Sequence, residues 1–376
     1  MASSSAAPLP THHRALVLET IEEEFTVKTV PTSQPDSGSA VVRILEAGVP
    51  SYHREVYNGE RHYDFPKPIV GGLSAIARIA AVGPDATVLQ PGQLVFMDCV
   101  IRARDNPDSM FLIAIHEGMD AGSRRLTNEV WRDGAFAEYM KVPLENCIPL
   151  NETRLCRELG YSSRELMYMM YLMVPFGGLR DIRLEPGETI VVCPATGGFG
   201  GTGVQVAIAM GARVIAMGRN DKELARLKEH VETNSPNASS RIEIVKMTGD
   251  LETDVASLKA FGTIDAVIDF TPPFASKSTH LKSAISCLRR GGRCSMMGYV
   301  EDVIHWNVMA LNITLKGKLM YERDDMVLFV NMLERGLFPR AKDLVEPKVF
   351  KMEQCKEALD AAAEWTGIRR TVMIEP

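Results

Sequence analysis

The chain lacks the features that would tie it to a membrane, to nucleic acid or to secretion. No uninterrupted apolar run approaches the roughly 20 residues that a membrane-spanning helix needs. Basic clusters are also missing and the formal net charge is -6, which argues against nucleic acid or an anionic membrane as a partner. Residues 1–13 contain neither the basic nor the apolar part of a secretory signal, and we expect them to form a flexible tail.

Paired cysteines are missing too. The seven cysteines are odd in number, scattered along the chain and never spaced as Cys-x-x-Cys. This pattern favours reduced thiols in a reducing compartment, and we expect a cytoplasmic protein. The remaining composition, 45% hydrophobic and 24% charged over 376 residues, is that of a globular protein with one large or two smaller domains.

The first 150 residues and the rest of the chain carry different patterns. Short apolar runs such as "RALVLE", "AVVRILEAGV" and "GQLVFM" alternate with Gly, Pro and Asp at first, which is typical of an antiparallel barrel or sandwich. Within this part, residues 102–131 are polar and too long for a routine turn, so we predict a functional or interface loop there.

From about residue 175, strands such as "ETIVVC" and "RVIAMG" alternate with helical segments, which predicts a doubly wound parallel sheet. The final residues, from "RDDMVLFVNMLERG" onward, indicate helix, strand, helix and strand, and we place them on the first domain. We therefore predict an α/β protein with residues 14–172 and 322–376 in the first domain and 173–321 in the second.

The stretch "PATGGFGGTG", Pro194 to Gly203, follows a strand and opens a helix, the context in which glycines bring the backbone close to a dinucleotide pyrophosphate. Two registers fit, "GFGGTG" and "ATGGFG". We favour the second, because it keeps Gly200 where the helix must press on the strand. The alternative is a glycine-rich turn without a ligand. The residues expected to bind the cofactor here are Ala195, Thr196, Gly197, Gly198, Phe199 and Gly200.

The end of the second strand indicates which dinucleotide would bind. An NAD site places Asp or Glu there to hold the ribose hydroxyls, whereas this strand ends with Gly218, Arg219 and Asn220. A small residue leaves room for a 2′-phosphate, and the Arg219 guanidinium offers it a bidentate partner. The alternative is an exposed arginine at a helix start capped by Asn220. We expect NADPH.

Several motifs carry a resemblance to a known family. The segments "EAGVPSYHREVYNG", "PIVGG", "VGPDATVLQPGQLVF" and "DGAFAEY", followed by the glycine loop, resemble the medium-chain dehydrogenase/reductase superfamily from about Arg14 to Pro376. The loop "VVCPATGGFGG" is most similar to the quinone oxidoreductase and enoyl reductase branch, and the whole chain is similar to fungal members labelled alcohol dehydrogenases. The resemblance implies a GroES-like β-barrel catalytic domain, a Rossmann domain, an active site between them and a homodimer.

The chain departs from the zinc-binding members of that superfamily at each ligand position. Their first cysteine is replaced by Pro50, and their "GHE" segment is "GGL", Gly71–Leu73. The third region, "YMMYLMVPFGG", has no Cys, His or Asp, and the four-cysteine lobe gives way to residues 102–131. Because proline, glycine and leucine cannot bind zinc, we expect no metal in the active site.

Zinc-free members mostly reduce polarised C=C bonds in quinones, enones or enoyl thioesters, or C=N bonds, where the charge is delocalised and a hydrogen-bond donor suffices. Tyr52 falls where zinc-binding members place the hydroxyl that contacts the substrate oxygen, so its phenol is the expected proton donor or oxyanion partner. His53 and Glu55 are expected relay groups. The alternatives are that Tyr52 is a packing residue and His53 a surface histidine.

Two further groups complete the expected site. Thr271, Gly298 and Tyr299 follow strands at the edge of the sheet where ligands bind, and we assign them to the cofactor. Met173, Pro175 and Phe176 are expected to wall the substrate pocket, although such methionine-rich stretches also form plain core.

The sequence thus predicts a zinc-independent, NADPH-dependent reductase of a polarised C=C bond in a small organic molecule. The first alternative is a ketone, aldehyde or C=N reductase. The second is a protein that binds NADPH without catalysis.

Overall fold

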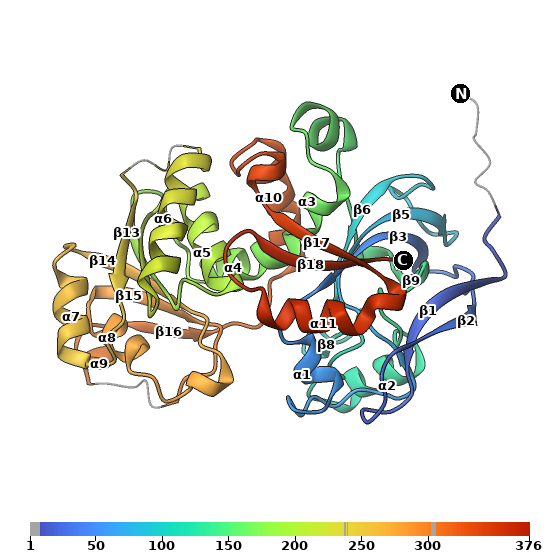
Figure 1. Cartoon of the computed structure of the whole chain (residues 1–376), viewed down its shortest axis with the longest axis horizontal. Helices are drawn as coiled ribbons and strands as arrows, with labels where there is room; N and C mark the ends of the chain where they lie inside the picture. Colours follow the sequence, from blue (N-terminus) through green and yellow to red (C-terminus); the bar gives the residue numbers. More distant parts are fainter. Residues whose placement is uncertain (1–7, 237, 239, 302–305) are drawn as a thin grey trace. The chain divides into compact units, whose positions relative to one another are not determined.

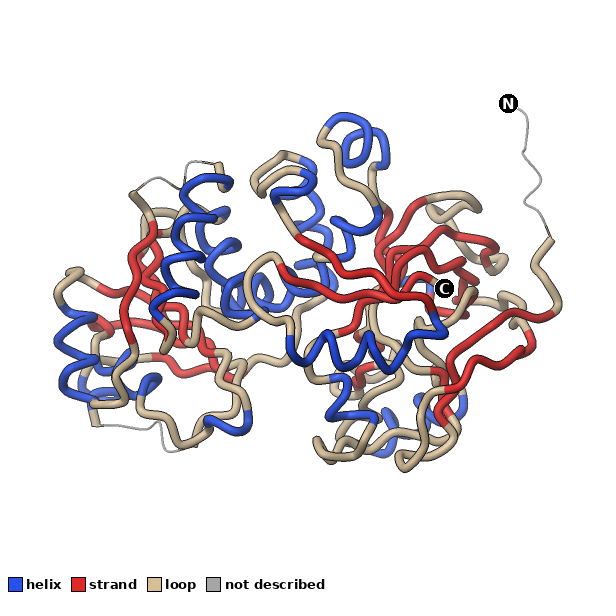
Figure 2. The backbone as a smooth tube through the Cα atoms, in the orientation of Figure 1, coloured by secondary structure: helices blue, strands red, loops and turns tan. Residues whose placement is uncertain are grey.

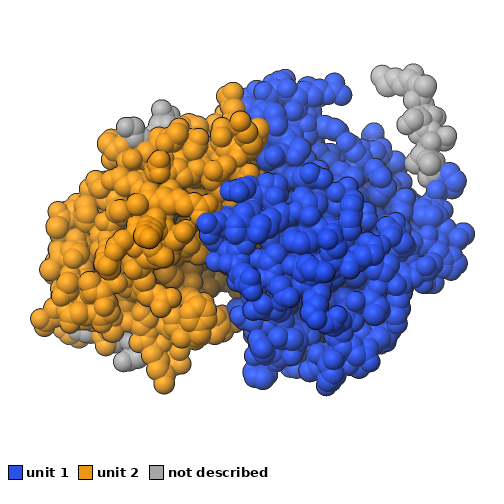
Figure 3. Space-filling view, viewed as in Figure 1, with its two compact units in different colours: residues 1–168, 346–366, 370–376 blue, residues 169–345, 367–369 orange. Residues whose placement is uncertain are grey.

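The computed structural model describes residues 8–236, 238, 240–301 and 306–376, so the first seven residues of the expected tail lie outside the described residues. The chain divides into two compact units (Figure 3). Unit 1 holds residues 1–168, 346–366 and 370–376, and unit 2 holds residues 169–345 and 367–369. No helix in the described ranges is both long enough and apolar enough to cross a membrane. All seven cysteines are free thiols.

Unit 1 is built around strand β3 (Ser39–Val49), which pairs antiparallel with three other strands and is buried along almost its whole length. Its main sheet has the order β10-β6-β5-β3-β18-β17, and β9 also pairs with β3. The other strands of this sheet are β5 (Ala75–Val82), β6 (Leu94–Met97), β9 (Tyr139–Pro143), β10 (Cys147–Pro149), β17 (Glu346–Lys351) and β18 (Arg370–Glu375). The sequence of β3 is a nearly continuous apolar run because this strand is buried on both faces.

The remaining elements of unit 1 are short (Figure 1). A second sheet has the order β2-β1-β4, and β7 pairs with β8. The elements are β1 (His12–Leu18), β2 (Thr26–Pro31), β4 (Ile69–Val70), β7 (Val100–Arg102), β8 (Met110–Leu112), α1 (His53–Tyr57), α2 (Ala121–Glu129), α3 (Ser163–Met167) and α11 (Cys355–Glu364). Since β1 begins at His12, ordered structure starts two residues before the end of the expected tail.

Residues 102–131, which we predicted as a functional or interface loop, include regular elements. They contain β8 and the helix α2, which begins after Asp120 because the Asp120 carboxylate accepts hydrogen bonds from the backbone N–H groups of Gly122 (2.8 Å) and Ser123 (3.1 Å). The residues after α2, including Trp131 and Arg132, line a groove of about 690 Å³ together with β1 and β2. A functional role for this stretch stays a prediction.

Unit 2 contains a six-stranded parallel sheet with the order β13-β12-β11-β14-β15-β16, in which β11 and β14 are neighbours where the order reverses. Its strands are β11 (Thr189–Cys193), β12 (Arg213–Gly218), β13 (Ile242–Lys246), β14 (Ile264–Asp269), β15 (Leu288–Met296) and β16 (Thr314–Gly317). This is the order of a Rossmann sheet, and it confirms the predicted doubly wound domain.

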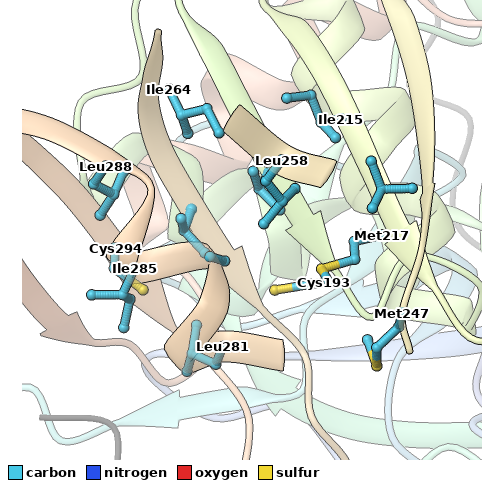
Figure 4. Close-up of a cluster of buried hydrophobic side chains, with 14 of the residues drawn as sticks. Cys193, Ile215, Met217, Met247, Leu258, Ile264, Leu281, Ile285, Leu288 and Cys294 are labelled. Atoms are coloured by element: carbon cyan, nitrogen blue, oxygen red, sulfur yellow. The ribbon is translucent and has the colours of Figure 1, made fainter. Parts of the chain in front are cut away.

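Helices cover both faces of this sheet (Figure 2). The helices of unit 2 are α4 (Met169–Asp181), α5 (Gly198–Ala209), α6 (Asp221–Asn234), α7 (Leu251–Lys259), α8 (His280–Ser286), α9 (Asn307–Ala310) and α10 (Arg323–Glu334), of which α10 packs on α4. A cluster of buried side chains fills the space between the strands and helices α7 and α8, with Cys193, Leu258 and Leu281 among its members (Figure 4). The strands read as continuous apolar runs because both of their faces are buried.

Helix α10 belongs to unit 2, although the predicted domain limits place it in the first domain. Helix α10, which we placed on the first domain, packs on α4 within unit 2, where the Phe176 and Phe329 rings lie 5.6 Å apart. Arg180 on α4 also forms an ion pair with Asp325 on α10 (3.5 Å). The two helices therefore share an apolar interface that the order of elements alone did not indicate. The domain limits stay a prediction, because compact units need not coincide with domains.

Candidate functional site

The glycine loop leads directly into α5, whose N-terminus can hold an anion. The helix begins at Gly198, and the preceding Gly197 has an extended backbone (φ -80°, ψ 175°). The first N–H groups of a helix have no carbonyl partner inside it, and they carry the positive end of the helix dipole. A β-carbon placed on Gly197 would meet no atom within 4 Å, so space is open beside these N–H groups. This arrangement fits a pyrophosphate.

Gly200 lies where α5 packs most closely on the end of β11. A β-carbon at this position would lie 2.0 Å from the backbone oxygen of Pro194, so no side chain can be accommodated. The favoured register, "ATGGFG", places the close contact between helix and strand at this residue. Gly203 is also closely packed, because its β-carbon would lie 2.9 Å from the Phe270 ring.

Tyr171 on α4 lies beside the loop, and the sequence analysis did not single it out. Its ring is 5.1 Å from the Phe199 ring, and its backbone oxygen accepts a hydrogen bond from the Thr202 hydroxyl (3.1 Å). The three residues expected to wall the pocket lie two to five positions further along α4. Met173 and Phe176 are almost fully buried, and Pro175 is buried inside the helix. These three side chains belong to the core of unit 2, and their role as a pocket wall stays a prediction.

The end of β12 carries no carboxylate beside the loop. A β-carbon on Gly218 would lie 3.0 Å from Thr196 and 3.2 Å from Leu224, so a larger residue would crowd both. Arg219 is exposed. Asn220 caps α6, because its side-chain oxygen accepts hydrogen bonds from the N–H groups of Lys222 (3.0 Å) and Glu223 (3.3 Å).

Lys246 adds a second cation at this point, and the sequence reasoning missed it. It is the last residue of β13 and lies opposite Gly218 in the parallel register. Its ammonium group forms an ion pair with Asp221 (2.5 Å), and both side chains are more than half exposed. The signal that could have found Lys246 is its position, because a residue at the end of the third strand lies next to the end of the second.

A buried polar network lies at the carboxyl end of β14. The Asp269 carboxylate accepts hydrogen bonds from the Thr271 hydroxyl and from the Thr271 N–H (3.2 Å). His280 on α8 contacts the Thr271 hydroxyl (2.8 Å) and Asp269 (3.4 Å) through Nε2, and the Ser278 hydroxyl (2.7 Å) through Nδ1. Asp269, Thr271 and His280 are all at most 1% exposed.

Two of the residues expected to bind the cofactor are part of this structure. The Tyr299 N–H donates to the Thr271 oxygen (2.8 Å), and a β-carbon on Gly298 would lie 2.2 Å from the Thr271 nitrogen. The side-chain and backbone groups of Thr271 are therefore engaged inside the protein. The Tyr299 side chain is 49% exposed. Their contact with a cofactor stays a prediction.

Cys193, Asp269 and His280 are the one group of three potential metal ligands among the described residues, with ligand atoms within 4.8 Å of one another. Burial, followed by the charge of Asp269, raises the pKa of the Cys193 thiol well above its usual value. The Nε2 atom of His280 already has protein partners. We therefore interpret this group as a hydrogen-bond network.

In unit 1, Tyr52 lies beside a cation. It is the N-cap residue of α1 and is half-buried. The Arg61 guanidinium lies over the Tyr52 ring, 4.6 Å from its centre, and over the Tyr63 ring at 5.3 Å. Arg61 also forms an ion pair with Glu55 (3.5 Å), and its side chain is only 16% exposed. The structure thus brings Tyr52 and Glu55 together through Arg61, a residue that no local pattern pointed to.

His53 is fully buried, so the alternative of a surface histidine is wrong. Its ring makes edge contacts with the rings of Tyr52 (5.7 Å), Tyr57 (5.3 Å) and Phe136 (5.9 Å). Neither ring nitrogen has a hydrogen-bond partner among the described residues. Burial, with a smaller contribution from Arg61, lowers the pKa of His53 to about 3. The relay role assigned to His53 stays a prediction, but no protein hydrogen bond within the described chain connects it to Tyr52 or Glu55.

This burial makes stability dependent on pH. The unfolded His53 takes up a proton near pH 6.5, whereas the folded side chain stays neutral down to about pH 3. Stability is therefore full above pH 6.5 and is lost as the pH falls toward 3, by about 2 kcal/mol at pH 5. We expect urea midpoints at pH 7.5 and 5.0 to differ less in His53→Phe than in the wild type. An unchanged difference in the variant would contradict this assignment.

Pro50 and Gly72 stand at the positions where the resemblance to zinc-binding members places two ligands. Pro50 has no donor atom on its side chain. Gly72 has a left-handed backbone (φ +98°), and a β-carbon there would lie 2.6 Å from the Phe136 ring and 2.7 Å from the Phe136 nitrogen. The Gly72 N–H donates a hydrogen bond to the Tyr57 hydroxyl (2.8 Å). Phe136 and Tyr57 thus take up the space around this position.

Comparison with known proteins gives two family matches. A model described as "Alcohol dehydrogenase GroES-like domain" matches residues 36–152, and one described as "Zinc-binding dehydrogenase" matches residues 198–335. Together these ranges cover the central strand of unit 1 and most of unit 2.

Curated relatives and solved structures extend the comparison along the chain. The chain is 24% identical to "Alcohol dehydrogenase 1" of Caenorhabditis elegans over 348 residues, 90% of this chain and 91% of that protein. It is 29% identical to "Acryloyl-coenzyme A reductase" of Metallosphaera sedula over 212 residues, 56% of this chain and 60% of that protein. A thermostable alcohol dehydrogenase from Pyrobaculum aerophilum shares the fold, with a TM-score of 0.72 and 19% identity over 97% of this chain and 100% of that one.

Proposed function

The chain belongs to the medium-chain dehydrogenase/reductase superfamily of oxidoreductases, and on that premise we propose that it is a zinc-independent, NADPH-dependent reductase of polarised C=C bonds. Its substrate is a small enone, quinone or enoyl compound. The observation that carries this proposal is the replacement of the zinc-ligand position by Gly72, packed against Phe136.

Zinc independence rests on the residues that stand at the ligand positions. A histidine at position 72 would need the space of Phe136 and a backbone that favours glycine. Pro50 cannot replace a thiolate. Without a Lewis acid, a substrate that delocalises its own negative charge requires less stabilisation than a saturated carbonyl. This difference favours C=C reduction.

The preference for NADPH rests on the end of β12. Gly218 is followed by the exposed Arg219, and Lys246 lies opposite Gly218 on the neighbouring strand. Two cations next to a small residue suit a 2′-phosphate, whereas an NAD site needs a carboxylate at this point. The Asp221 carboxylate in the first turn of α6 is paired with Lys246.

When bound at the α5 N-terminus, NADPH supplies the hydride. The glycine loop would hold the pyrophosphate on the α5 N–H groups, and Arg219 and Lys246 would hold the 2′-phosphate. Tyr52 donates its phenolic proton to the enolate that forms in the substrate, or stabilises its oxygen by a hydrogen bond. The Arg61 guanidinium over the ring then stabilises the negative charge left on Tyr52.

A second candidate is reduction of a ketone or aldehyde. The similarity to "Alcohol dehydrogenase 1" of C. elegans supports it, because that name indicates a carbonyl and alcohol pair as substrate and product. The similarity to an acryloyl-coenzyme A reductase supports the first candidate. A C=N reductase and a protein that binds NADPH without turnover are the remaining alternatives, and the product of the reaction distinguishes all four.

The test of the function compares a cyclic enone with its saturated ketone. The purified protein would be incubated with NADPH and each compound, and the products identified by mass spectrometry. We expect the saturated ketone from the enone and no product from the ketone. Alcohol from either compound would establish carbonyl reduction instead. Tight NADPH binding without turnover on any electrophile would favour the non-catalytic alternative.

Arg219→Ala should change cofactor preference. We expect kcat/KM with NADPH to fall about 10- to 100-fold, since a charge-assisted hydrogen bond to a phosphate is lost. The value with NADH should change less than about 3-fold, because NADH has no 2′-phosphate. Arg226→Ala serves as the control, because Arg226 lies on α6, the helix that follows Arg219, and pairs with Glu223 (3.4 Å). Equal losses with both cofactors in Arg219→Ala would contradict the assignment.

We also propose a homodimer formed along the edge of the unit 2 sheet. Strand β16 is the last strand of that sheet, and large apolar side chains next to it are exposed, among them Met309 (76%) and Leu319 (58%). Light scattering of the purified protein tests this, and a monomer mass would exclude it.

A further inference from the structure

Asp269 places a buried carboxylate where this fold binds its ligands. In a doubly wound sheet the ligand lies outside the carboxyl ends of the strands, at the point where the strand order reverses. Here that point lies between β11 and β14, and Asp269 is the last residue of β14. Its side chain is fully buried.

The contacts of Asp269 leave its charge largely uncompensated. One carboxylate oxygen, Oδ1, interacts with Thr271 and with His280 Nε2 (3.4 Å). The other, Oδ2, has no hydrogen-bond partner among the described residues and lies against Gly298, whose β-carbon would be 2.4 Å away. No Lys or Arg within the described ranges forms an ion pair with Asp269, and His280 is its one cationic partner when protonated.

Three titratable groups face this carboxylate. His280 comes from α8, Cys193 from β11 and Cys294 from β15, and the charge of Asp269 contributes to the raised pKa of both thiols. The thiols are neutral at physiological pH, because burial adds to the same effect. Among the described residues, His280 is thus the one group that can offset the negative charge of Asp269 at the carboxyl end of β14, the edge where ligands bind in this fold.

We propose that Asp269 sets the relative affinity of the protein for the two forms of the cofactor, by stabilising the oxidised nicotinamide over the reduced one. This inference rests on the proposed function. Oxidised nicotinamide carries a positive charge on its ring and reduced nicotinamide does not, so a buried carboxylate near the ring attracts only the oxidised form. Preferential binding of the product form of the cofactor favours departure of the hydride.

The test measures dissociation constants rather than turnover. NADPH binding is followed by its fluorescence, and NADP⁺ binding by competition with NADPH. In Asp269→Asn, which keeps the size of the side chain and removes its charge, we expect the Kd for NADP⁺ to rise about tenfold. The Kd for NADPH should change less than about twofold. Asp269→Ser removes the same charge and gives a second folded variant if the asparagine is not tolerated.

Asp254→Asn is the matched control. Asp254 is also fully buried in unit 2, and its carboxylate accepts hydrogen bonds from the Thr248 N–H (2.9 Å) and hydroxyl (2.7 Å) while its other oxygen has no partner within the described chain. It lies on α7, away from the reversal of the sheet. We expect the ratio of the two dissociation constants to stay at the wild-type value in this variant.

The outcomes separate this inference from the proposed function. A wild-type protein that binds neither dinucleotide would overturn both. A wild type that binds both, with Asp269→Asn weakening the two equally, would leave the function intact and reduce Asp269 to a structural residue. One equivalent of tightly bound zinc that is lost in Cys193→Ser would also overturn the inference, because the metal would then hold the carboxylate.

Discussion

Tyr52→Phe should lower kcat for enone reduction by about 10²- to 10⁴-fold, the range in which a positioned proton donor contributes. The change removes only the hydroxyl group of Tyr52, and the ring under Arg61 remains. The Kd for NADPH should stay within about twofold of the wild type, because the residues assigned to the cofactor belong to unit 2 and Tyr52 to unit 1. Steady-state kinetics and a fluorescence titration give the two numbers.

Tyr63→Phe is the control for this variant. Its ring also lies near the Arg61 guanidinium, at 5.3 Å, but Tyr63 is not assigned to the substrate. We expect its kcat to change less than about threefold. If Tyr52→Phe retained full kcat with an unchanged product, the proton would come from another group, and Tyr52 would be a packing residue as the alternative from the sequence held.

Gly200→Ala should destabilise the protein strongly, by about 1–3 kcal/mol or more, because the added carbon overlaps the backbone oxygen of Pro194. A flexible side chain could move away, but this oxygen belongs to the backbone directly after the buried strand β11. The shift of α5 needed to relieve the overlap would also displace the N–H groups that face the pyrophosphate. We expect a lower melting temperature together with loss of NADPH binding.

Gly197→Ala separates the two effects. Its β-carbon meets no protein atom within 4 Å, and its backbone is one that alanine adopts freely. The melting temperature without cofactor should therefore stay close to that of the wild type. NADPH binding should weaken, since the methyl group occupies the space beside the helix N-terminus. A variant that binds NADPH normally would show that the pyrophosphate does not approach this residue.

The sequence allowed the fold to be predicted wherever one local pattern determined one element. Buried strands such as β11 and β14 are continuous apolar runs because both faces of a parallel sheet are covered. The stretch 102–131 was harder, because its short strand and helix depend on side-chain caps such as Asp120 and not on apolar periodicity. The helix on which α10 packs could not be predicted, for a related reason. The amphipathic pattern of α10 indicates that one of its faces is buried, but it does not indicate which helix covers that face.

The candidate site was predictable only where its residues are close in sequence. The glycine loop and the end of β12 follow from spacing along one βαβ unit. Arg61, Lys246 and His280 were missed, because each reaches its partner through the packing of separate elements. Arg61 contacts Tyr52 from a loop nine residues later, and His280 meets Asp269 from a helix. No spacing rule along a single chain indicates such contacts.

The packing of Phe136 on Gly72 also limits how this protein can be redesigned. A histidine introduced at position 72 would overlap both the ring and the backbone nitrogen of Phe136, and it would have to adopt a backbone angle that L-residues avoid. Engineering a metal-dependent alcohol dehydrogenase from this scaffold therefore requires repacking of Phe136 together with the exchange of the ligand residues.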